Sequence, residues 1–242
     1  MACILHIETA TEIGSFAISK DGDLQHYDVS TTNFSHSASM GRFVEAGIHL
    51  LDEEGLKPDA VAISEGPGSY TGLRIGVSLA KGLCFGFDIP LIAIPTLKIM
   101  TAGLFRFISR EASVFYCPMI DARRMEVYSA IYDENLTIIR PVQADIITTD
   151  SFREYLSRGK ALFFGNGSDK CKTVIDSANA VFVDKVYPEA SAMIELADIA
   201  YANREFVDLA YFEPFYLKSF QATVPKNKII PTVDIPVQIA KK

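Results

Sequence analysis

Hydrophobic and polar positions along the start of the chain alternate in short runs. Three apolar runs separated by polar turns open the chain, at residues 2–7, 15–19 and 24–30. Runs of this length predict strands, and the Asp-Gly pair between the second and third runs is typical of a tight hairpin turn. The chain is therefore expected to begin with a three-stranded antiparallel meander.

The next segments alternate between helical and extended periods. Between residues 37 and 54 the apolar positions fall on one helical face, and a second, more apolar helix is expected over residues 71–87. Compact apolar runs at 60–64 and 91–94 predict strands, and a third helical stretch follows over residues 96–110. Strands that alternate with helices predict parallel additions to the opening meander, and thus an α/β fold.

The strand pattern then restarts. Apolar runs at 114–120 and 127–132 flank a polar segment and predict a second hairpin that opens a second, smaller unit. Helical segments are expected around Phe152 and Met193, and a strand over residues 161–164. We therefore expect an N-terminal part, a smaller C-terminal part and a flexible tail, over residues 1–108, 109–224 and 225–242.

Composition narrows the class of protein. Hydrophobic residues make up 49% of the 242 residues and charged residues 22%, the balance of a folded globule. No apolar stretch approaches the about 20 residues of a membrane helix, and no secretory leader is recognisable, so a cytoplasmic protein without membrane contact is expected. The four cysteines are far apart and predict reduced core thiols. The net charge of −7 disfavours unaided binding of nucleic acid.

A glycine-rich loop precedes the second helix, at the place where free backbone N–H groups favour an anion. Its spacing matches neither a P-loop nor a dinucleotide fingerprint, because no Lys follows and the third glycine is missing. One interpretation that stays open is a small-molecule module with an anion at this helix start. The residues of that candidate site are Gly66, Gly68, Ser69 and Thr71.

Small residues recur every four positions in the second helix, at Gly72, Gly76 and Ala80. Such a stripe lets another helix approach closely, and the helix is apolar on nearly all sides. Two interpretations are open: a central core helix, or a docking surface for another subunit. The expected partner face adds apolar positions of both helices to the stripe, namely Met40, Phe43, Gly47, Leu50, Leu73, Leu79 and Leu83.

Four motifs in order resemble the TsaB (YeaZ) family, closely over residues 3–133 and less so afterwards. They are the segments at residues 4–11, 66–76, 121–128 and 164–167. The resemblance implies an ASKHA fold (actin-like, Hsp70-like, RNase H-like), with two subdomains that each contain a mixed sheet opened by antiparallel strands and flanked by helices. It also implies a subunit that pairs with the catalytic paralogue TsaD and with the ATPase TsaE during threonylcarbamoyl transfer to tRNA adenosine 37.

Further expectations follow for the assembly. A docking surface of this kind is self-complementary in principle, so a homodimer is expected where the partner is absent. Contact with tRNA is expected only within the complex. The alternative function is an ASKHA-type ATPase or a metal-dependent peptidase of the glycoprotease-like family.

The resemblance also implies that metal-ligating and phosphate-binding residues of related enzymes are absent from this chain. The catalytic paralogue carries an HxxxH metal pair, and Thr96 and Met100 occupy the corresponding positions here. Nucleotide-binding members hold phosphates between glycine-containing turns, whereas this chain has Glu12 in the first turn and no glycine beside Arg123 and Arg124 in the second. We therefore expect no metal, no cofactor and no catalytic residue.

Other polar residues keep more than one interpretation. Glu8 stands where the family usually has Asp, either to cap nearby backbone amides or to help to place a hydrated metal. His6 lies on a predicted strand between apolar neighbours, which favours a core or inter-strand role. The side chains of Arg123 and Arg124 are either solvated or in contact with a partner's acidic groups or a tRNA phosphate.

Overall fold

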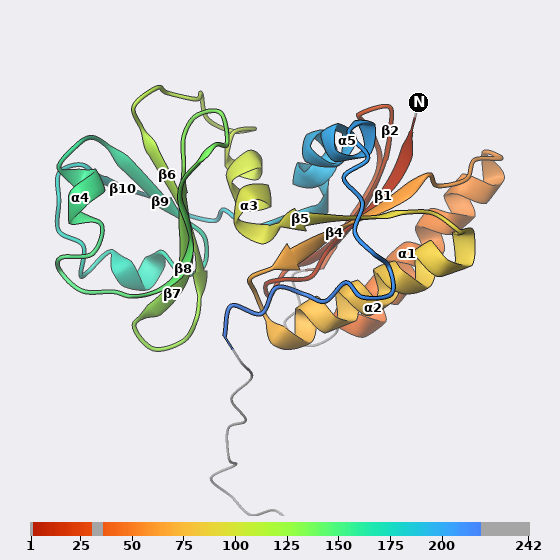
Figure 1. The fold of residues 1–242 in the computed structure, drawn as a ribbon, viewed down its shortest axis with the longest axis horizontal. Coiled ribbons are helices and arrows are strands. Elements are labelled where there is room, and N and C mark those ends of the chain that lie inside the picture. The colour runs from red at the N-terminus through yellow and green to blue at the C-terminus, as the bar shows by residue number, and fades with distance from the viewer. Residues whose placement is uncertain (1, 31–35, 219–242) are drawn as a thin grey trace, which may run out of the picture.

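A computed structural model describes residues 2–30 and 36–218, which form two lobes joined side by side (Figure 1). Each lobe is built on a five-stranded sheet. The first sheet has the order β3-β2-β1-β4-β5. Its strands are β1 (Cys3–Glu8), β2 (Gly14–Lys20), β3 (Asp23–Ser30), β4 (Ala60–Gly66) and β5 (Leu91–Pro95).

The first sheet is mixed, as the sequence predicted. Strands β1, β2 and β3 pair antiparallel in chain order, while β4 is parallel to β1 and β5 is parallel to β4. The turn between β2 and β3 places Asp21 and Gly22 at φ angles of 54° and 84°, a left-handed conformation that suits the Asp-Gly pair. The expected antiparallel meander is therefore confirmed.

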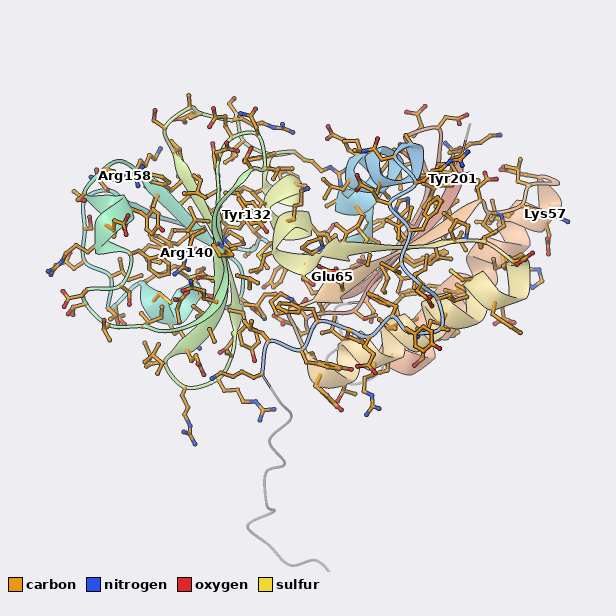
Figure 2. The ribbon with its side chains drawn as sticks, viewed as in Figure 1. Lys57, Glu65, Tyr132, Arg140, Arg158 and Tyr201 are labelled. Atoms are coloured by element: carbon orange, nitrogen blue, oxygen red, sulfur yellow. The ribbon has the colours of Figure 1, made fainter. Side chains whose placement is uncertain are left out.

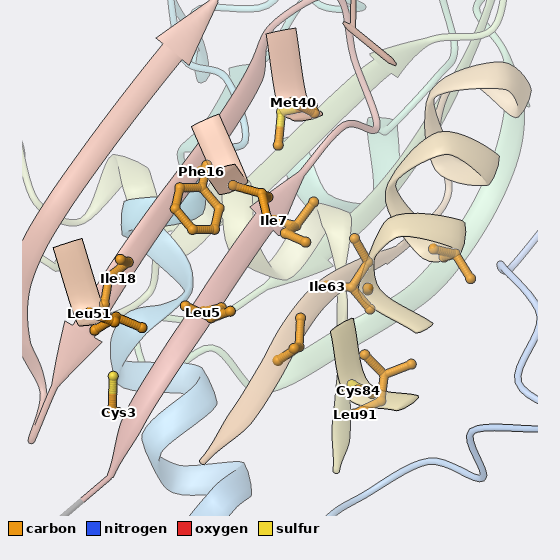
Figure 3. Close-up of a cluster of buried hydrophobic side chains, with 14 residues drawn as sticks. Cys3, Leu5, Ile7, Phe16, Ile18, Met40, Leu51, Ile63, Cys84 and Leu91 are labelled. Carbon is orange, nitrogen blue, oxygen red and sulfur yellow. The ribbon is translucent and has the colours of Figure 1, made fainter. Parts of the chain in front are cut away.

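Two helices of 18 residues, α1 (His36–Glu53) and α2 (Tyr70–Phe87), cover one face of this sheet (Figure 1). Alternate residues of β1 and β2 point towards these helices and form the main core, which Figure 3 shows. The labelled members are Cys3, Leu5, Ile7, Phe16, Ile18, Met40, Leu51, Ile63, Cys84 and Leu91. This packing fixes the position of both helices, which the sequence analysis proposed as a docking surface.

The opposite face of the first sheet is covered by the end of the chain. The short η2 (Ala190–Met193) and the helix α5 (Ile194–Ala202) pack there against apolar residues of β1, β4 and β5. The described chain then continues along α2 to residue 218 (Figure 1). The sequence analysis assigned residues 109–224 to the second part, whereas this returning segment belongs to the first lobe.

The second lobe repeats the strand arrangement of the first. Its order β8-β7-β6-β9-β10 matches β3-β2-β1-β4-β5, with β6, β7 and β8 antiparallel and β9 and β10 parallel additions. Its strands are β6 (Phe115–Asp121), β7 (Glu126–Tyr132), β8 (Ile138–Ile146), β9 (Ala161–Phe164) and β10 (Ala180–Val183). The predicted second hairpin is confirmed, while β8 and β10 were not predicted.

Short helices complete the structure. The helix α3 (Thr96–Leu104) ends six residues before the predicted limit and lies between the lobes, against β6 and η2. The second lobe adds the single turn α4 (Arg153–Leu156) and the short η1 (Asp169–Cys171). All four cysteines are unpaired and buried, as predicted. None of the helices in the described ranges combines the length and the apolar character that a membrane crossing needs. The predicted tail, residues 225–242, lies outside those ranges.

Candidate functional site

The stripe of small residues on α2 faces the protein's own first sheet. A Cβ atom on Gly72 would lie 2.0 Å from the carbonyl oxygen of Thr9, and one on Gly76 would lie 2.2 Å from the Thr9 Oγ1. The Thr9 hydroxyl also donates a hydrogen bond to the Gly72 carbonyl, at 2.8 Å. Ala80 is fully buried. The stripe is thus a contact within the chain, and the expectation that it meets a partner is corrected.

Three further residues of the expected partner face also point inward. Met40 and Leu73 are buried in the core. A Cβ atom on Gly47 would lie 2.4 Å from the Phe16 ring, so α1 uses this glycine to approach β2. Sequence spacing grouped these residues on one face of each helix. In the structure that face of α1 and of α2 is turned towards the sheet.

The remaining residues of the expected face stay accessible. Phe43 of α1 and Leu79 and Leu83 of α2 are half-buried at the edge of the core, and Leu50 is 39% exposed. Two phenylalanines of α2 that the sequence analysis left out of the partner face are also exposed, Phe87 on the side of Leu83 and Phe85 on another side of the helix: Phe85 is 83% exposed and Phe87 is 37% exposed. We name these six side chains the α1–α2 surface. Exposed aromatic side chains of this size are typical of protein interfaces.

The glycine-rich loop is held against the first turn of the chain. Gly66 N donates to Thr96 Oγ1 at 3.1 Å, and Ser69 N donates to the Ala10 carbonyl at 2.7 Å. A Cβ atom on Gly68 would lie 2.4 Å from that same carbonyl, and Thr71 is exposed. The Ser69 hydroxyl caps α2 by accepting from Gly72 N. The amides of Gly66 and Ser69 are therefore occupied, and the anion site in this loop stays a prediction.

Glu8 caps backbone at the end of β1. Its side chain is fully buried, and Oε1 accepts a hydrogen bond from Ala10 N at 2.6 Å. The other oxygen, Oε2, and the hydroxyl of Ser64 are both buried. Burial raises the pKa of Glu8 to about 7, against the opposing effect of hydrogen bonds from the Ala10 amide, the Ser64 hydroxyl and the Thr9 amide. This geometry matches the capping interpretation of Glu8.

His6 lies in the core and links strands β1 and β2. Its Nε2 lies 2.7 Å from the hydroxyl of Ser19 on β2, and its ring is fully buried. Burial lowers the pKa of His6 to about 3, so the imidazole is neutral at physiological pH. The predicted inter-strand role is therefore confirmed.

Thr96 and Met100, the two positions at which the resemblance implies a missing metal pair, lie on α3. Thr96 is buried and accepts from Gly66 N, while Met100 is buried against the Gly165 turn. Neither side chain is a good ligand for a divalent metal ion of the kind that a pair of histidines binds. Among the described residues, no three or more His, Cys, Asp or Glu side chains are grouped so as to hold a metal ion.

Side-chain contacts join the two lobes. Asn166 Nδ2 donates to Glu12 Oε2 at 2.6 Å, and Asn166 Oδ1 accepts from the backbone N of Asp121 at 3.0 Å. Glu65 of β4 and Tyr132 of β7 also come from opposite lobes (Figure 2). Burial raises the pKa of Glu65, and burial together with the Glu65 charge raises that of Tyr132. Asn166 thus joins a turn of the first lobe to the end of β6 in the second.

The chain's similarity to known proteins agrees with this arrangement. The model of the TsaD family, tRNA N6-adenosine threonylcarbamoyltransferase, matches residues 31–226. The chain belongs to this family. Within it, the chain is similar to proteins called tRNA threonylcarbamoyladenosine biosynthesis protein TsaB. The Haemophilus influenzae TsaB is 27% identical over 228 residues, 89% of this chain and 93% of the relative. The Escherichia coli TsaB is 29% identical over 228 residues, 89% of this chain and 94% of the relative.

A solved structure supports the same branch of the family. A Pseudomonas aeruginosa protein described as similar to the peptidase YeaZ superposes with a TM-score of 0.78 at 25% identity. The superposition covers 90% of this chain and all of the other. The TsaB resemblance that four short motifs carried therefore holds over most of the chain, and the ASKHA fold predicted from it is confirmed.

Proposed function

We propose that the chain is a non-catalytic scaffold subunit in the synthesis of threonylcarbamoyladenosine at position 37 of tRNA. In this role it pairs with a TsaD-type catalytic paralogue and supports the binding of a TsaE-type ATPase. The observation that carries the proposal is the α1–α2 surface, where Leu50, Phe85 and Phe87 are exposed and three further apolar side chains are only partly covered by the described chain. The TsaB relatives, named for this biosynthesis, supply the pathway.

The α1–α2 surface has the composition of a docking site. Phe85 and Phe87 provide aromatic anchors, and such anchors dominate the energetics of protein interfaces. Both helices are fixed by the core beneath them, so the surface is preformed and loses little conformational entropy on binding. The same surface can meet a second copy of itself, which gives a homodimer where the paralogue is absent.

The polar residues at the ends of β1, α3 and the connecting turns support a scaffold rather than an ATPase or a peptidase. Glu8 is buried and engaged in capping, and Thr96 and Met100 replace the ligand pair of the catalytic paralogue. Asn166 bonds to Glu12 in the first of the turns that a nucleotide-binding relative keeps for phosphates.

Docking is tested with two matched phenylalanine variants. Phe85→Asp places a charge on the α1–α2 surface, while Phe107→Asp places one on an equally exposed phenylalanine after α3. Phe85→Asp should weaken binding to the TsaD-type paralogue at least tenfold, or about 1.4 kcal/mol, as measured by titration calorimetry. Phe107→Asp should bind like the wild type. Equal affinity for both variants contradicts docking through this surface.

The pathway and the absence of catalysis need a second experiment. Depletion of the protein in cells should lower threonylcarbamoyladenosine in total tRNA, quantified by mass spectrometry. The purified chain alone should hydrolyse neither ATP nor peptides above background. A hydrolytic activity that survives repurification and disappears in Glu8→Ala would instead support the ATPase or peptidase alternative.

A further inference from the structure

The hairpin between β6 and β7 carries two arginines in an unusual backbone conformation. Arg123 and Arg124 have φ angles of 70° and 50°, both in the left-handed region. Residues with a side chain occupy this region at a cost, and two in a row persist only where the surroundings hold them. Glycine or asparagine is the ordinary choice for such a tip, so the arginines need a reason beyond the turn itself.

A lysine from η1 holds the hairpin in place. Lys170 Nζ donates to Asp121 Oδ1 at 2.5 Å, to the Arg124 carbonyl at 2.8 Å and to the Glu126 carbonyl at 2.6 Å. Its side chain is only 20% exposed, and Asp121 Oδ1 also accepts from Arg123 N at 2.7 Å. Lys170 thus neutralises Asp121 and fixes the backbone of the hairpin, so that the charges of the two arginines stay uncompensated by it.

Both arginine side chains are exposed and have no ion pair with any described residue. A further cation lies close by, because Lys218 pairs with Glu126 at the base of the hairpin. Burial raises the pKa of Tyr128, the charges of Lys218 and Arg123 oppose that shift, and the charge of Glu126 adds to it. Tyr128 lies on β7 two residues after Glu126, the partner of Lys218, so it belongs to the same side of the hairpin.

Aromatic rings continue this cluster towards α2. The rings of Tyr216 and Tyr70 lie 4.7 Å apart, and the Arg74 guanidinium lies 5.2 Å from the centre of the Tyr70 ring. Tyr216 is two residues from Lys218, which joins this group to the hairpin. We name the combined set the arginine–tyrosine surface: Tyr70, Arg74, Arg123, Arg124, Tyr128, Tyr216 and Lys218.

The charge of this surface differs from that of the whole chain. The net charge of the chain is −7, yet on this surface cations outnumber carboxylates. Asp121 and Glu126 are already neutralised by Lys170 and Lys218, while Glu213 lies near Tyr216 and Glu12 is held by Asn166 beside the base of the hairpin. This surface is basic although the whole chain is acidic, and it is lined with tyrosines. Such a surface suits a ribose-phosphate backbone and its bases, since guanidinium groups bind phosphates and aromatic faces stack on bases.

We propose that the arginine–tyrosine surface contacts the sugar-phosphate backbone of the tRNA while the chain is bound to its catalytic paralogue. This proposal rests on the proposed function for the presence of tRNA in the assembly. An acidic protein would also pair with the arginines, and the test below distinguishes it from tRNA. The chain thereby contributes part of the tRNA-binding surface of the assembly, although its negative net charge disfavours tRNA binding by the chain alone.

The test replaces both arginines by glycine, Arg123→Gly with Arg124→Gly, which removes two charges and suits the left-handed backbone. The matched control is Lys185→Gly with Arg204→Gly, since these exposed cations also have positive φ angles, of 61° and 56°, but lie after β10 and α5. Each variant is assembled with the paralogue, and its affinity for unmodified tRNA is measured by fluorescence anisotropy over a range of salt concentrations.

We expect the hairpin variant to bind tRNA about tenfold more weakly at 0.1 M salt, and its salt dependence of log K to become shallower by about 1.5. Affinity for the paralogue and the thermal midpoint should not fall. The control variant should bind tRNA like the wild type.

Three results overturn the proposal: unchanged tRNA affinity, an equal loss in the control variant, or weakened paralogue binding with unchanged tRNA affinity per assembled complex. The last result would assign the surface to an acidic protein. Failure of the proposed function is a separate outcome, in which the wild-type assembly itself forms no threonylcarbamoyladenosine.

Discussion

At the residue scale, Thr9 sets how closely α2 approaches the first sheet. Its carbonyl and its hydroxyl occupy the space beside Gly72 and Gly76, and no side chain fits between them. Gly82 lies on the same helix with nothing within 4 Å of its Cβ position. Gly72 and Gly76 are therefore required for the close packing of α2 on the sheet, whereas Gly82 is not.

This difference gives a direct prediction. Gly72→Ala should lower the free energy of unfolding by about 1 to 3 kcal/mol, because the new methyl group overlaps the Thr9 backbone. Gly82→Ala should raise it by about 0.5 to 1 kcal/mol, since alanine favours the helix and meets open space. Urea denaturation of both variants measures the two changes. A similar effect of both substitutions would mean that the Thr9 contact is not tight.

Glu8 gives the second prediction at this scale, through its dependence on pH. Its pKa in the folded chain is raised to about 7 from an ordinary value of 4.5, so the folded state holds the proton over a wider range. The folded state then binds more protons than the unfolded state between these two values. Stability from this group is present at low pH and is lost as the pH rises towards 7.

The comparison with Glu8→Gln isolates this effect. From pH 8 to pH 5 the wild type should gain about 2 to 3 kcal/mol of stability relative to the variant. His6 acts in the opposite direction, because its lowered pKa removes stability as the pH falls below its ordinary value of 6.5, but it is present in both proteins. Urea denaturation at both pH values provides the measurement. A difference that does not change with pH would show that Glu8 is ionised in the folded chain at neutral pH.

At the scale of elements, the segment from residue 205 to 218 acts as part of the first lobe. Val207 N donates to the Leu91 carbonyl, Phe215 N donates to the Glu65 carbonyl, and Lys81 Nζ donates to the Ala210 carbonyl. Val207, Leu209 and Phe212 add apolar side chains to the main core. The segment has no regular secondary structure, and these contacts hold it along α2.

Adjacent aromatic residues of this segment allow a matched test. Phe212 packs against the core, whereas Tyr211 is 85% exposed. Phe212→Ala should destabilise the chain by about 1 to 3 kcal/mol, less than a fully buried phenylalanine. Tyr211→Ala should stay within about 0.5 kcal/mol of the wild type. Thermal unfolding of both variants decides whether the segment is docked in solution, since equal stabilities would mean that it is not.

The elements differ in how far the sequence predicts them. The first meander, both long helices and β9 follow from the local pattern, because the helices bury one face and β1, β2 and β9 are compact apolar runs that are almost entirely buried. Strand β8 was missed because it lies at a sheet edge, contains Pro141 and exposes side chains on both faces, which removes the alternation. Local periods also cannot tell which neighbour covers a face. For that reason the stripe on α2 was assigned equally to a partner and to the core.

At the scale of the whole molecule, Asn166 connects the two lobes. Its side chain bonds to Glu12 of the first lobe and to the backbone of Asp121 in the second. Replacement by alanine leaves the amide of Asp121 without this acceptor and frees the turn around Glu12. The lobes should then separate more readily, while each keeps its own core.

Hydrogen exchange provides the measurement. In Asn166→Ala the amides near Asp121 and near the turn after β1 should exchange several-fold faster, with β4 and β9 unchanged. Asn203→Ala is the control, because Asn203 bonds only to Glu205 at the surface and belongs to one lobe. If exchange in the two turns is the same in both variants, the bridge through Asn166 does not restrain the lobes.

The return of α5 to the first sheet has a consequence for synthesis on the ribosome. The strands of the second lobe lie together in the chain between Phe115 and Val183, so this lobe is complete as soon as β10 has emerged. The first sheet emerges earlier but waits for η2 and α5 to cover Ile4, Ala62 and Ile92. The second lobe is therefore an insertion that can fold first, while the nascent first lobe keeps an apolar sheet face open to chaperones. A ribosome that stalls before residue 190 leaves that face permanently bare.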